Sequence, residues 1–383
     1  MFRREWDRFC ATWPVQSELS DCNTESDDVA SWIINTAGPN WQVATRYEFL
    51  RLEHLIRANL AQPLWRQLAR TARWMIDDIV SGALLRVFRT SWRMGVLLIY
   101  SQILLLTWIA VALAGGWLAA SAISSTGGPA VVTIILAGIS TAGCFALLRP
   151  LADGIFVNQL NNCWPYLREF ARGAPTGFDR PLDILAGRIV AAARAREADE
   201  ILVVGHSAGA MLALTTIVRA LERDPDIGRH GPQISVVTVG SIMPALAMHP
   251  AAKALRGTVA KMATERSVLW VDCQSHEDFM NFWAFDPVAG IGVDAGERRC
   301  NPQIWQVPVR EMIAPEVFAK VRFNYWRMHY QYIMSNDRRA SYDYYMFLCG
   351  PAPFADWAAQ DGSACERFDT DGNYRTPEIK AAE

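Results

Sequence analysis

The sequence predicts an α/β fold: a mostly parallel sheet flanked by helices and interrupted by a two-helix transmembrane hairpin. Two observations lead to this prediction. No charged side chain occurs between Arg93 and Arg149, whereas charged residues are frequent on both sides of that stretch. Farther along, the apolar, mainly β-branched run 201–204 passes through a glycine-containing turn into an Ala/Leu-rich segment. That order of elements is typical of a buried parallel strand followed by a helix.

Composition excludes several classes of protein. The chain has 383 residues, of which 51% are hydrophobic and 20% charged, so it has ample material for a core and is not a disordered chain. The 37 basic residues are balanced by 39 acidic ones. Because nucleic-acid-binding proteins usually carry a basic excess, we expect no nucleic acid among the partners.

Cysteine spacing gives no sign of a disulfide scaffold or a metal site. The 8 cysteines are scattered, without a Cys-x-x-Cys pair, which fits reduced thiols in a cytosol-facing protein. The sequence also contains no glycine-rich nucleotide loop and no metal-ligand spacing, so we expect neither a cofactor nor a metal ion. The charged N-terminus lacks an apolar segment behind it, and a cleavable signal peptide is therefore not expected.

The N-terminal part, residues 1–93, is expected to belong to the same domain as the later strands. Residues 32–36 and 41–45 are candidate short strands, and 48–59 a candidate helix. Residues 60–93 carry apolar side chains at helical spacing, with arginines between them. Two interpretations of that helix stay open: it lies on an anionic membrane surface, or it packs on the soluble part of the protein.

The hairpin is expected within residues 94–148. Residues 95–120 form one apolar run and 130–148 a second, separated by a polar, glycine-containing break at 124–129. About 20 apolar helical residues span the hydrocarbon core of a bilayer, so both runs suit transmembrane helices. The alternative is a buried helical hairpin in a soluble core, which a stretch this long without a charge disfavours.

Basic residues near the hairpin predict its orientation. Arg86, Arg89 and Arg93 precede the first run and Arg149 follows the second, whereas the break between the runs has no basic residue. Basic residues favour the cytoplasmic side of a membrane. We therefore expect a two-span membrane protein whose ends, and the parts attached to them, face the cytoplasm.

The turn at residues 205–209 has the pattern of a nucleophile elbow. It reads Gly-His-Ser-Ala-Gly, with the strand 201–204 before it and the helical segment 210–223 after it. Glycines two residues before and two after Ser207 relieve crowding in such a tight turn. The turn exposes the Ser207 hydroxyl as a nucleophile, and the backbone N–H of Ala208 can stabilise an oxyanion.

These residues resemble the α/β-hydrolase superfamily, in particular its lipase- and esterase-like serine hydrolases. The resemblance covers residues 181–350, within an expected catalytic part of 149–350, and the elbow is its most specific motif. It includes a helix at 181–198 and further strands at 234–241 and 267–272. The resemblance implies a catalytic triad in the chain order serine, acid, histidine.

The acid is expected at or after the carboxyl end of strand 267–272. Four residues are candidates: Asp272, Glu277, Asp278 and Asp286. Asp286-Pro287-Val288 looks like the turn that carries the acid in lipase-like relatives. Asp286 is therefore the preferred candidate, and Asp272 is the second choice.

The histidine follows from the same chain order. Of the 6 histidines only His329 lies beyond Asp286, among aromatic residues at the start of a helix-like stretch. His206 adjoins Ser207 on the turn and is excluded as the base by geometry. The predicted triad is Ser207, Asp286 and His329, with an ester or lipid as substrate and the lipid bilayer as partner.

The sequence departs from the family at the N-terminal side. The family takes a second oxyanion donor from a loop after an earlier strand, often with a His-Gly pair, and this chain has no such pair. The early strands are reduced, or the chain starts inside the usual domain. Loss of one donor costs about 10²–10³ in rate.

Two functions are therefore consistent with the sequence. One is a membrane-anchored serine hydrolase that cleaves a carboxylic ester or lipid through an acyl-enzyme. The other is a non-catalytic membrane-bound interaction protein on a degenerate hydrolase scaffold. Residues 351–383 contain few apolar side chains and are expected to form a loose tail. The oligomeric state has no signal in the sequence.

Overall fold

The computed structural model of the chain describes residues 2–24, 26–154, 157–359 and 363–376. The chain forms two compact units. Unit 1 comprises Met1–Glu53 and Glu169–Glu383, and unit 2 is the continuous segment His54–Arg168. The boundaries of unit 2 differ from the expected hairpin limits because the helices on both sides of the hairpin cluster with it.

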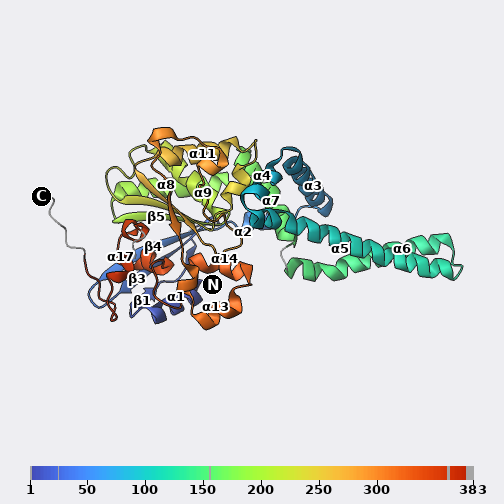
Figure 1. Cartoon of the computed structure of the whole chain (residues 1–383), viewed down its shortest axis with the longest axis horizontal. Coiled ribbons are helices and arrows are strands. Elements are labelled where there is room, and N and C mark those ends of the chain that lie inside the picture. Colours follow the sequence, from blue (N-terminus) through green and yellow to red (C-terminus); the bar gives the residue numbers. More distant parts are fainter. Residues whose placement is uncertain (1, 25, 155–156, 360–362, 377–383) are drawn as a thin grey trace. The chain divides into compact units, whose positions relative to one another are not determined.

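Unit 1 contains the expected parallel sheet (Figure 1). Its strands lie in the order β5-β6-β7-β8, which is also their order in the chain. The bounds are Glu200–His206, Gln233–Val239, Val268–Gln274 and Gln303–Gln306. Helices α8 (Asp179–Ala195), α9 (Gly209–Arg223) and α11 (Lys253–Thr264) connect or precede these strands. The α/β character and the strands predicted near 201, 234 and 267 are confirmed, whereas β8 was not expected.

The register of the parallel strands determines which residues lie together at one edge of the sheet. His206 pairs with Val239, and Val239 pairs with Cys273, so β5, β6 and β7 end at the same level. Val236, Val237 and Val239 are fully buried in the middle strand. The loops that leave the carboxyl ends of these three strands therefore meet at one edge of the sheet.

The N-terminal residues of unit 1 form a second, antiparallel sheet. After α1 (Phe2–Thr12) come β1 (Gln16–Leu19), β2 (Asn23–Thr24), β3 (Val29–Ala37) and β4 (Gln42–Leu50). β3 pairs with each of the other three. The predicted strands 32–36 and 41–45 lie inside β3 and β4. The helix expected at 48–59 begins later, as α2 (Glu53–Leu60), because residues 48–50 pair with β3.

The C-terminal residues complete the core of unit 1. Trp6, Phe9 and Ile34 share one hydrophobic cluster with Trp305 and Tyr345. The remaining short helices lie in this half: α10 (Met243–Ala247), η1 (Ala289–Ile291), η2 (Gly296–Arg298), α12 (Val309–Met312), α13 (Pro315–Val321), α14 (Tyr325–Tyr330), η3 (Gln331–Ile333) and α15 (Tyr344–Cys349).

The expected loose tail is packed over most of its length. α16 (Phe354–Ala358) and α17 (Ser363–Glu366) are followed by a bridge between Phe368 and Tyr374. Phe354, Trp357 and Phe368 are buried in the core of unit 1. A few large aromatic rings thus suffice to fix a segment that is poor in apolar residues. Residues 360–362 and 377–383 of the expected tail lie outside the described residues.

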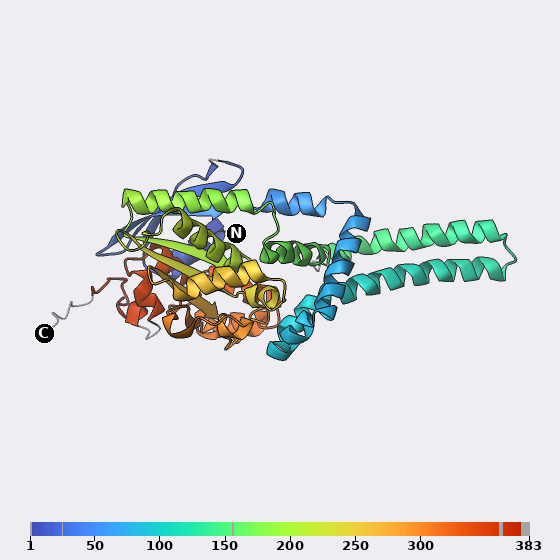
Figure 2. The same ribbon diagram turned by 90° about the horizontal axis from the view of Figure 1, so that it is seen from above.

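Unit 2 contains the hairpin (Figure 2). α5 (Trp92–Ser125) and α6 (Ala130–Gly154) are joined by a short turn, and both are long and apolar enough to cross a membrane. They approach closely at Gly116, where an added Cβ would lie 2.8 Å from the Ala137 carbonyl oxygen. The unit also contains α3 (Leu64–Val80), α4 (Ala83–Thr90) and most of α7 (Val157–Arg172).

The helical segment expected over 60–93 is divided into two helices. α3 ends before Gly82, whose φ of +69° belongs to the left-handed region that glycine adopts without strain. α4 ends at Thr90. Ser91 follows in an extended conformation, and its side chain caps α5 by accepting a hydrogen bond from the Met94 N–H.

Candidate active site

The expected strand, tight turn and helix surround Ser207. β5 ends at His206 and α9 begins at Gly209, so the turn between them is only two residues long. Ser207 has a φ of +57°, a left-handed conformation that costs a non-glycine residue free energy. Gly205 is required beside it, because an added Cβ would lie 2.5 Å from the Gly209 carbonyl oxygen.

Ala208 lies at the N-cap position of α9. The first N–H groups of a helix have no acceptor within the helix and carry a partial positive charge. The Ala208 N–H is therefore a backbone donor at the helix N-terminus, directly after Ser207.

His329 comes from α14 and is buried, with 2% of its surface exposed. Its Nδ1 lies 2.8 Å from Oδ2 of Asp278, a hydrogen bond between two buried side chains. With Asp278 ionised, its carboxylate can only accept, so Nδ1 carries the proton. The other ring nitrogen, Nε2, is left to accept a proton.

A tight loop after β7 holds Asp278 in place. Its Oδ1 accepts from the Met280 N–H at 2.8 Å. The Asn281 amide donates to the Ser275 carbonyl at 2.8 Å and to the Tyr332 hydroxyl at 3.1 Å. Hydrogen bonds within the loop, and one to Tyr332 in the segment that follows His329, thus fix the loop.

The carboxylate that pairs with His329 is therefore Asp278 and not Asp286, the residue preferred from the sequence. Asp286 instead forms a two-pronged ion pair with Arg299, at 2.6 and 2.8 Å, and caps the turn at Val288 and Ala289. Partial burial raises the pKa of Asp286, but the Arg299 guanidinium and the two backbone N–H groups outweigh it and lower that pKa overall. The Asp-Pro-Val pattern thus marks a structural turn.

The second choice, Asp272, is also engaged elsewhere. It accepts hydrogen bonds from the Thr238 hydroxyl and, at 2.8 Å, from the Gln274 amide. Burial raises the pKa of this carboxyl to about 6. Its side chain supports the ends of β6 and β7 and not His329.

Gly240 brings the serine turn and the histidine together. The Ser207 N–H donates to the Val239 carbonyl at 2.9 Å, and Gly240 is the next residue. A Cβ added to Gly240 would lie 3.1 Å from His329 Cε1 and 3.1 Å from Asp278 Oδ2. Gly240 at the end of β6 thus lies next to the imidazole and its carboxylate, and the residue before it bonds the Ser207 backbone.

His206 has a supporting position that the sequence did not reveal. Its Nε2 lies 3.0 Å from the His329 carbonyl oxygen, and the two rings are 4.5 Å apart. Because a carbonyl only accepts, His206 is the tautomer with a proton on Nε2. Burial, and then the neighbouring His329, lower the pKa of His206 to about 3, so it stays neutral.

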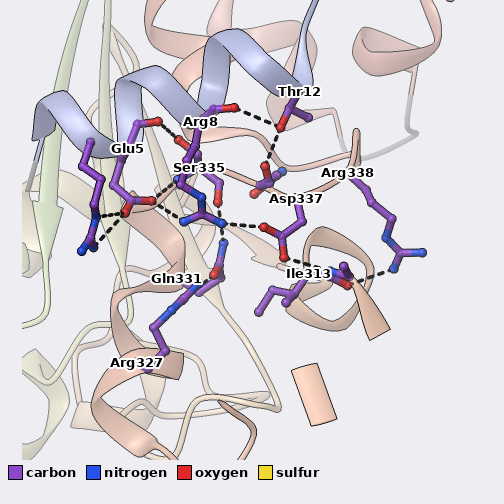
Figure 3. A network of polar contacts seen from close by, with 12 residues as sticks. Glu5, Arg8, Thr12, Ile313, Arg327, Gln331, Ser335, Asp337 and Arg338 are labelled. Carbon is purple, nitrogen blue, oxygen red and sulfur yellow. Dashed lines mark hydrogen bonds and ion pairs between the residues drawn. The ribbon is translucent and has the colours of Figure 1, made fainter. Parts of the chain in front are cut away.

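The N-terminal helix α1 anchors the segment that follows His329 (Figure 3). The buried carboxylate of Glu5 accepts from Arg8 at 2.8 Å and from the Ser335 N–H at 3.2 Å. Arg8 also donates to Asp337, whose other oxygen accepts from the Ala314 N–H at 3.0 Å. Residues near the N-terminus thus fix the segment that follows His329.

The second oxyanion donor expected from the family has no position assigned in the structure. Among the described residues, β5 has a partner strand on one side only and is an edge of its sheet. The earlier strands form the antiparallel sheet around β3 instead. The described residues also hold no group of three or more His, Cys, Asp or Glu side chains that could bind a metal ion.

Comparisons with protein-family models, with curated proteins and with solved structures found no match to this chain.

Proposed function

We propose that the protein is a membrane-anchored serine hydrolase of the α/β-hydrolase type that cleaves a carboxylic ester or lipid. The observation that carries the proposal is the meeting of a strained Ser207 turn with a buried His329–Asp278 pair at the carboxyl ends of β5–β7. Strain at a non-glycine residue and a buried imidazole–carboxylate pair are both typical of catalytic sites.

The proposed reaction is covalent acyl transfer. His329 Nε2 accepts the proton of the Ser207 hydroxyl while the oxygen attacks the ester carbonyl. Asp278 keeps the imidazole in the correct tautomer and stabilises its protonated form. The Ala208 N–H stabilises the oxyanion of the tetrahedral intermediate. His329 then protonates the departing alcohol, and it later activates the water that hydrolyses the acyl-enzyme.

Anchoring in a membrane is proposed from α5 and α6. Both are long and apolar enough to span a bilayer, and none of the described side chains in the apolar part of α6 is buried. Arg86, Arg89, Arg93 and Arg149 near their outer ends favour a cytoplasmic position for both ends. A hydrolase held at the cytoplasmic surface would meet esters that partition into the bilayer.

A non-catalytic interaction protein on a degenerate scaffold is the second candidate. The position of β5 at the edge of its sheet favours it, because the loop that supplies the second oxyanion donor in the family lacks its usual strand. The two candidates differ in one measurable property, the reactivity of Ser207.

Labelling by a fluorophosphonate probe tests the proposal. The purified wild-type protein should be labelled, and Ser207→Ala should abolish labelling while thermal unfolding stays cooperative. Ser241→Ala is the matched control, because Ser241 lies at the end of the adjacent strand and its hydroxyl caps Met243. An unlabelled wild type favours the scaffold, and labelled Ser207→Ala rejects Ser207 as the nucleophile. A panel of p-nitrophenyl esters then reports the acyl preference.

A further inference from the structure

Helix α3 of unit 2 exposes an apolar face. Trp65, Ile76, Ile79 and Val80 are 66%, 60%, 59% and 82% exposed. Positions 65, 69, 72, 76 and 79 are spaced by three or four residues, so they form one stripe along the helix. Ala69 and Ala72 complete the stripe and are exposed as well.

The opposite face of α3 packs inside the unit through Trp74, which stacks on Trp164 of α7, and through polar contacts. The Thr71 hydroxyl donates to the Asn161 carbonyl of α7 at 2.9 Å, and Asn162 donates to the Gln67 side chain at 2.7 Å. Asp78 forms a buried ion pair with Arg168. These three polar side chains of α3 therefore bond α7.

A water-soluble helix buries its apolar stripe and exposes its polar face, whereas α3 leaves an apolar stripe exposed and uses polar side chains inside the unit. Apolar surface left in water costs about 25 cal/mol per Å². A continuous apolar stripe on an exposed helix therefore marks a surface that meets apolar material. The apolar stripe alone does not tell whether lipid or protein covers it, but the charges beside the stripe distinguish the two.

Positive charge accompanies the stripe. Residues 54–93 contain seven arginines and two acids, Asp77 and Asp78, both of which pair with Arg168. Arg66 and Arg73 flank the stripe, and the Arg66 guanidinium lies 5.2 Å from the Trp65 ring centroid. A basic margin beside a Trp-containing apolar face is the pattern of a helix that lies in the headgroup layer of an anionic bilayer.

Continuity with the hairpin favours the same occupant. α4 follows α3 after two residues, and α5 begins at Trp92, with one residue between it and the end of α4. The stripe thus belongs to the unit that carries both candidate spans, on the chain segment that leads into the first one.

We infer that α3 lies in the headgroup layer of an anionic membrane leaflet, with Trp65, Ile76 and Ile79 inserted and Arg66 and Arg73 contacting lipid phosphates. The inference rests on the membrane anchoring in the proposed function, and it adds a lipid preference. Unit 2 then contains both membrane-spanning helices and a helix that lies on the membrane surface.

Lipid-borne quenchers test it on the full chain in vesicles. An environment-sensitive fluorophore is attached at Ile79→Cys, in a background with the exposed Cys22 and Cys300 replaced by Ser. Leu113→Cys, on an exposed position of α5, reports the span, and Glu222→Cys on α9 is the water-exposed control. The quencher is a nitroxide lipid with either a phosphatidylglycerol or a phosphatidylcholine headgroup.

The inference predicts quenching at positions 79 and 113 but not at 222. At position 79 the anionic quencher should be at least about two-fold more effective, and Arg66→Gln with Arg73→Gln should remove that difference. Quenching at position 113 without quenching at position 79 overturns the inference and leaves the anchoring intact. If the fluorophore at position 79 is then also blue-shifted, the apolar stripe is covered by protein, for example by a second copy of the chain. No quenching at 113 rejects the anchoring and the inference together. Equal quenching at 79 by both lipids overturns the anionic preference.

Discussion

Two aspartates in the loops after β7 have different partners. Asp278 accepts from the His329 imidazole, whereas Asp286 neutralises Arg299. Asp278→Asn should lower kcat for a p-nitrophenyl ester by about 10⁴, because the amide favours the wrong imidazole tautomer. Asp286→Asn, the matched control, should keep kcat within a few-fold of wild type and lose about 1 kcal/mol of stability at most. A larger loss of kcat in Asp286→Asn than in Asp278→Asn would contradict this assignment.

His206 makes the stability of the fold depend on pH. Its pKa is lowered from 6.5 to about 3 in the folded protein, so the unfolded chain binds a proton there at a higher pH than the folded one. This contribution is fully present above pH 6.5 and is lost progressively as the pH falls from 6.5 toward about 3. Thermal unfolding measured over this range should show the loss. His206→Gln keeps a donor for the His329 carbonyl and should flatten the slope; His230→Gln, at an exposed histidine, should not.

The candidate residues differ in how far the sequence could identify them. Ser207 is predictable because the constraints on it are local: a strand before, a helix after, and glycines two residues away on each side. Asp278 is harder to find because its role depends on a contact with His329, 51 residues later. Asp278 lies four residues after the end of β7, where the acid was expected, but the Asp-Pro-Val pattern makes Asp286 the more conspicuous candidate in the sequence.

At the scale of elements, α1 is expected to stabilise the His329 segment. Arg8 bonds both Glu5 and Asp337, and its side chain is 34% exposed, whereas Arg4 bonds Glu5 alone and is 72% exposed. Arg8→Gln should lower the free energy of unfolding by about 2–3 kcal/mol, because it leaves a buried carboxylate with less compensation.

Arg4→Gln is the control for the same carboxylate and should cost less than about 1 kcal/mol. Denaturant unfolding followed by tryptophan fluorescence measures both variants. Equal effects of the two substitutions would show that the Arg8–Asp337 contact contributes nothing of its own.

Elements with a strong local pattern are the ones that the sequence predicts. β5, β6, β7 and α9 have clear apolar periodicity, and they appear within a few residues of their expected positions. β1 and β8 have only four residues each, and α1, β1 and β8 pack or pair with residues that are not their neighbours in the chain. The same reason explains the tail, where Phe354 and Trp357 are fixed by a core that the sequence alone does not display.

At the scale of the whole molecule, the proposed topology has both ends of the hairpin on one side of the membrane. Cys22 and Cys300 are exposed natural reporters of unit 1. In sealed inverted vesicles, which expose the cytoplasmic face, an impermeant maleimide should label both of them. Thr126→Cys, in the turn between α5 and α6, should be labelled only after the vesicles are opened. Labelling of Thr126→Cys in sealed inverted vesicles would contradict the topology.

Hydropathy predicts the two apolar helices but not the limits of the unit around them. The apolar runs correspond to α5 and α6, because a long uncharged segment is a local property of the sequence. α3 and α7 join the same unit through hydrogen bonds such as Thr71 to Asn161, which are 90 residues apart in the chain. Such pairs of polar residues leave no periodic signal.

The division of unit 1 into Met1–Glu53 and Glu169–Glu383 also affects how the protein is made. During synthesis the N-terminal strands leave the ribosome well before their core partners, and contacts such as Glu5 with Ser335 span 330 residues. The apolar hairpin emerges between the two parts. If the hairpin inserts into a bilayer, insertion would therefore precede completion of unit 1. The nascent N-terminal segment must remain unassembled, and accessible to chaperones, until translation is nearly complete.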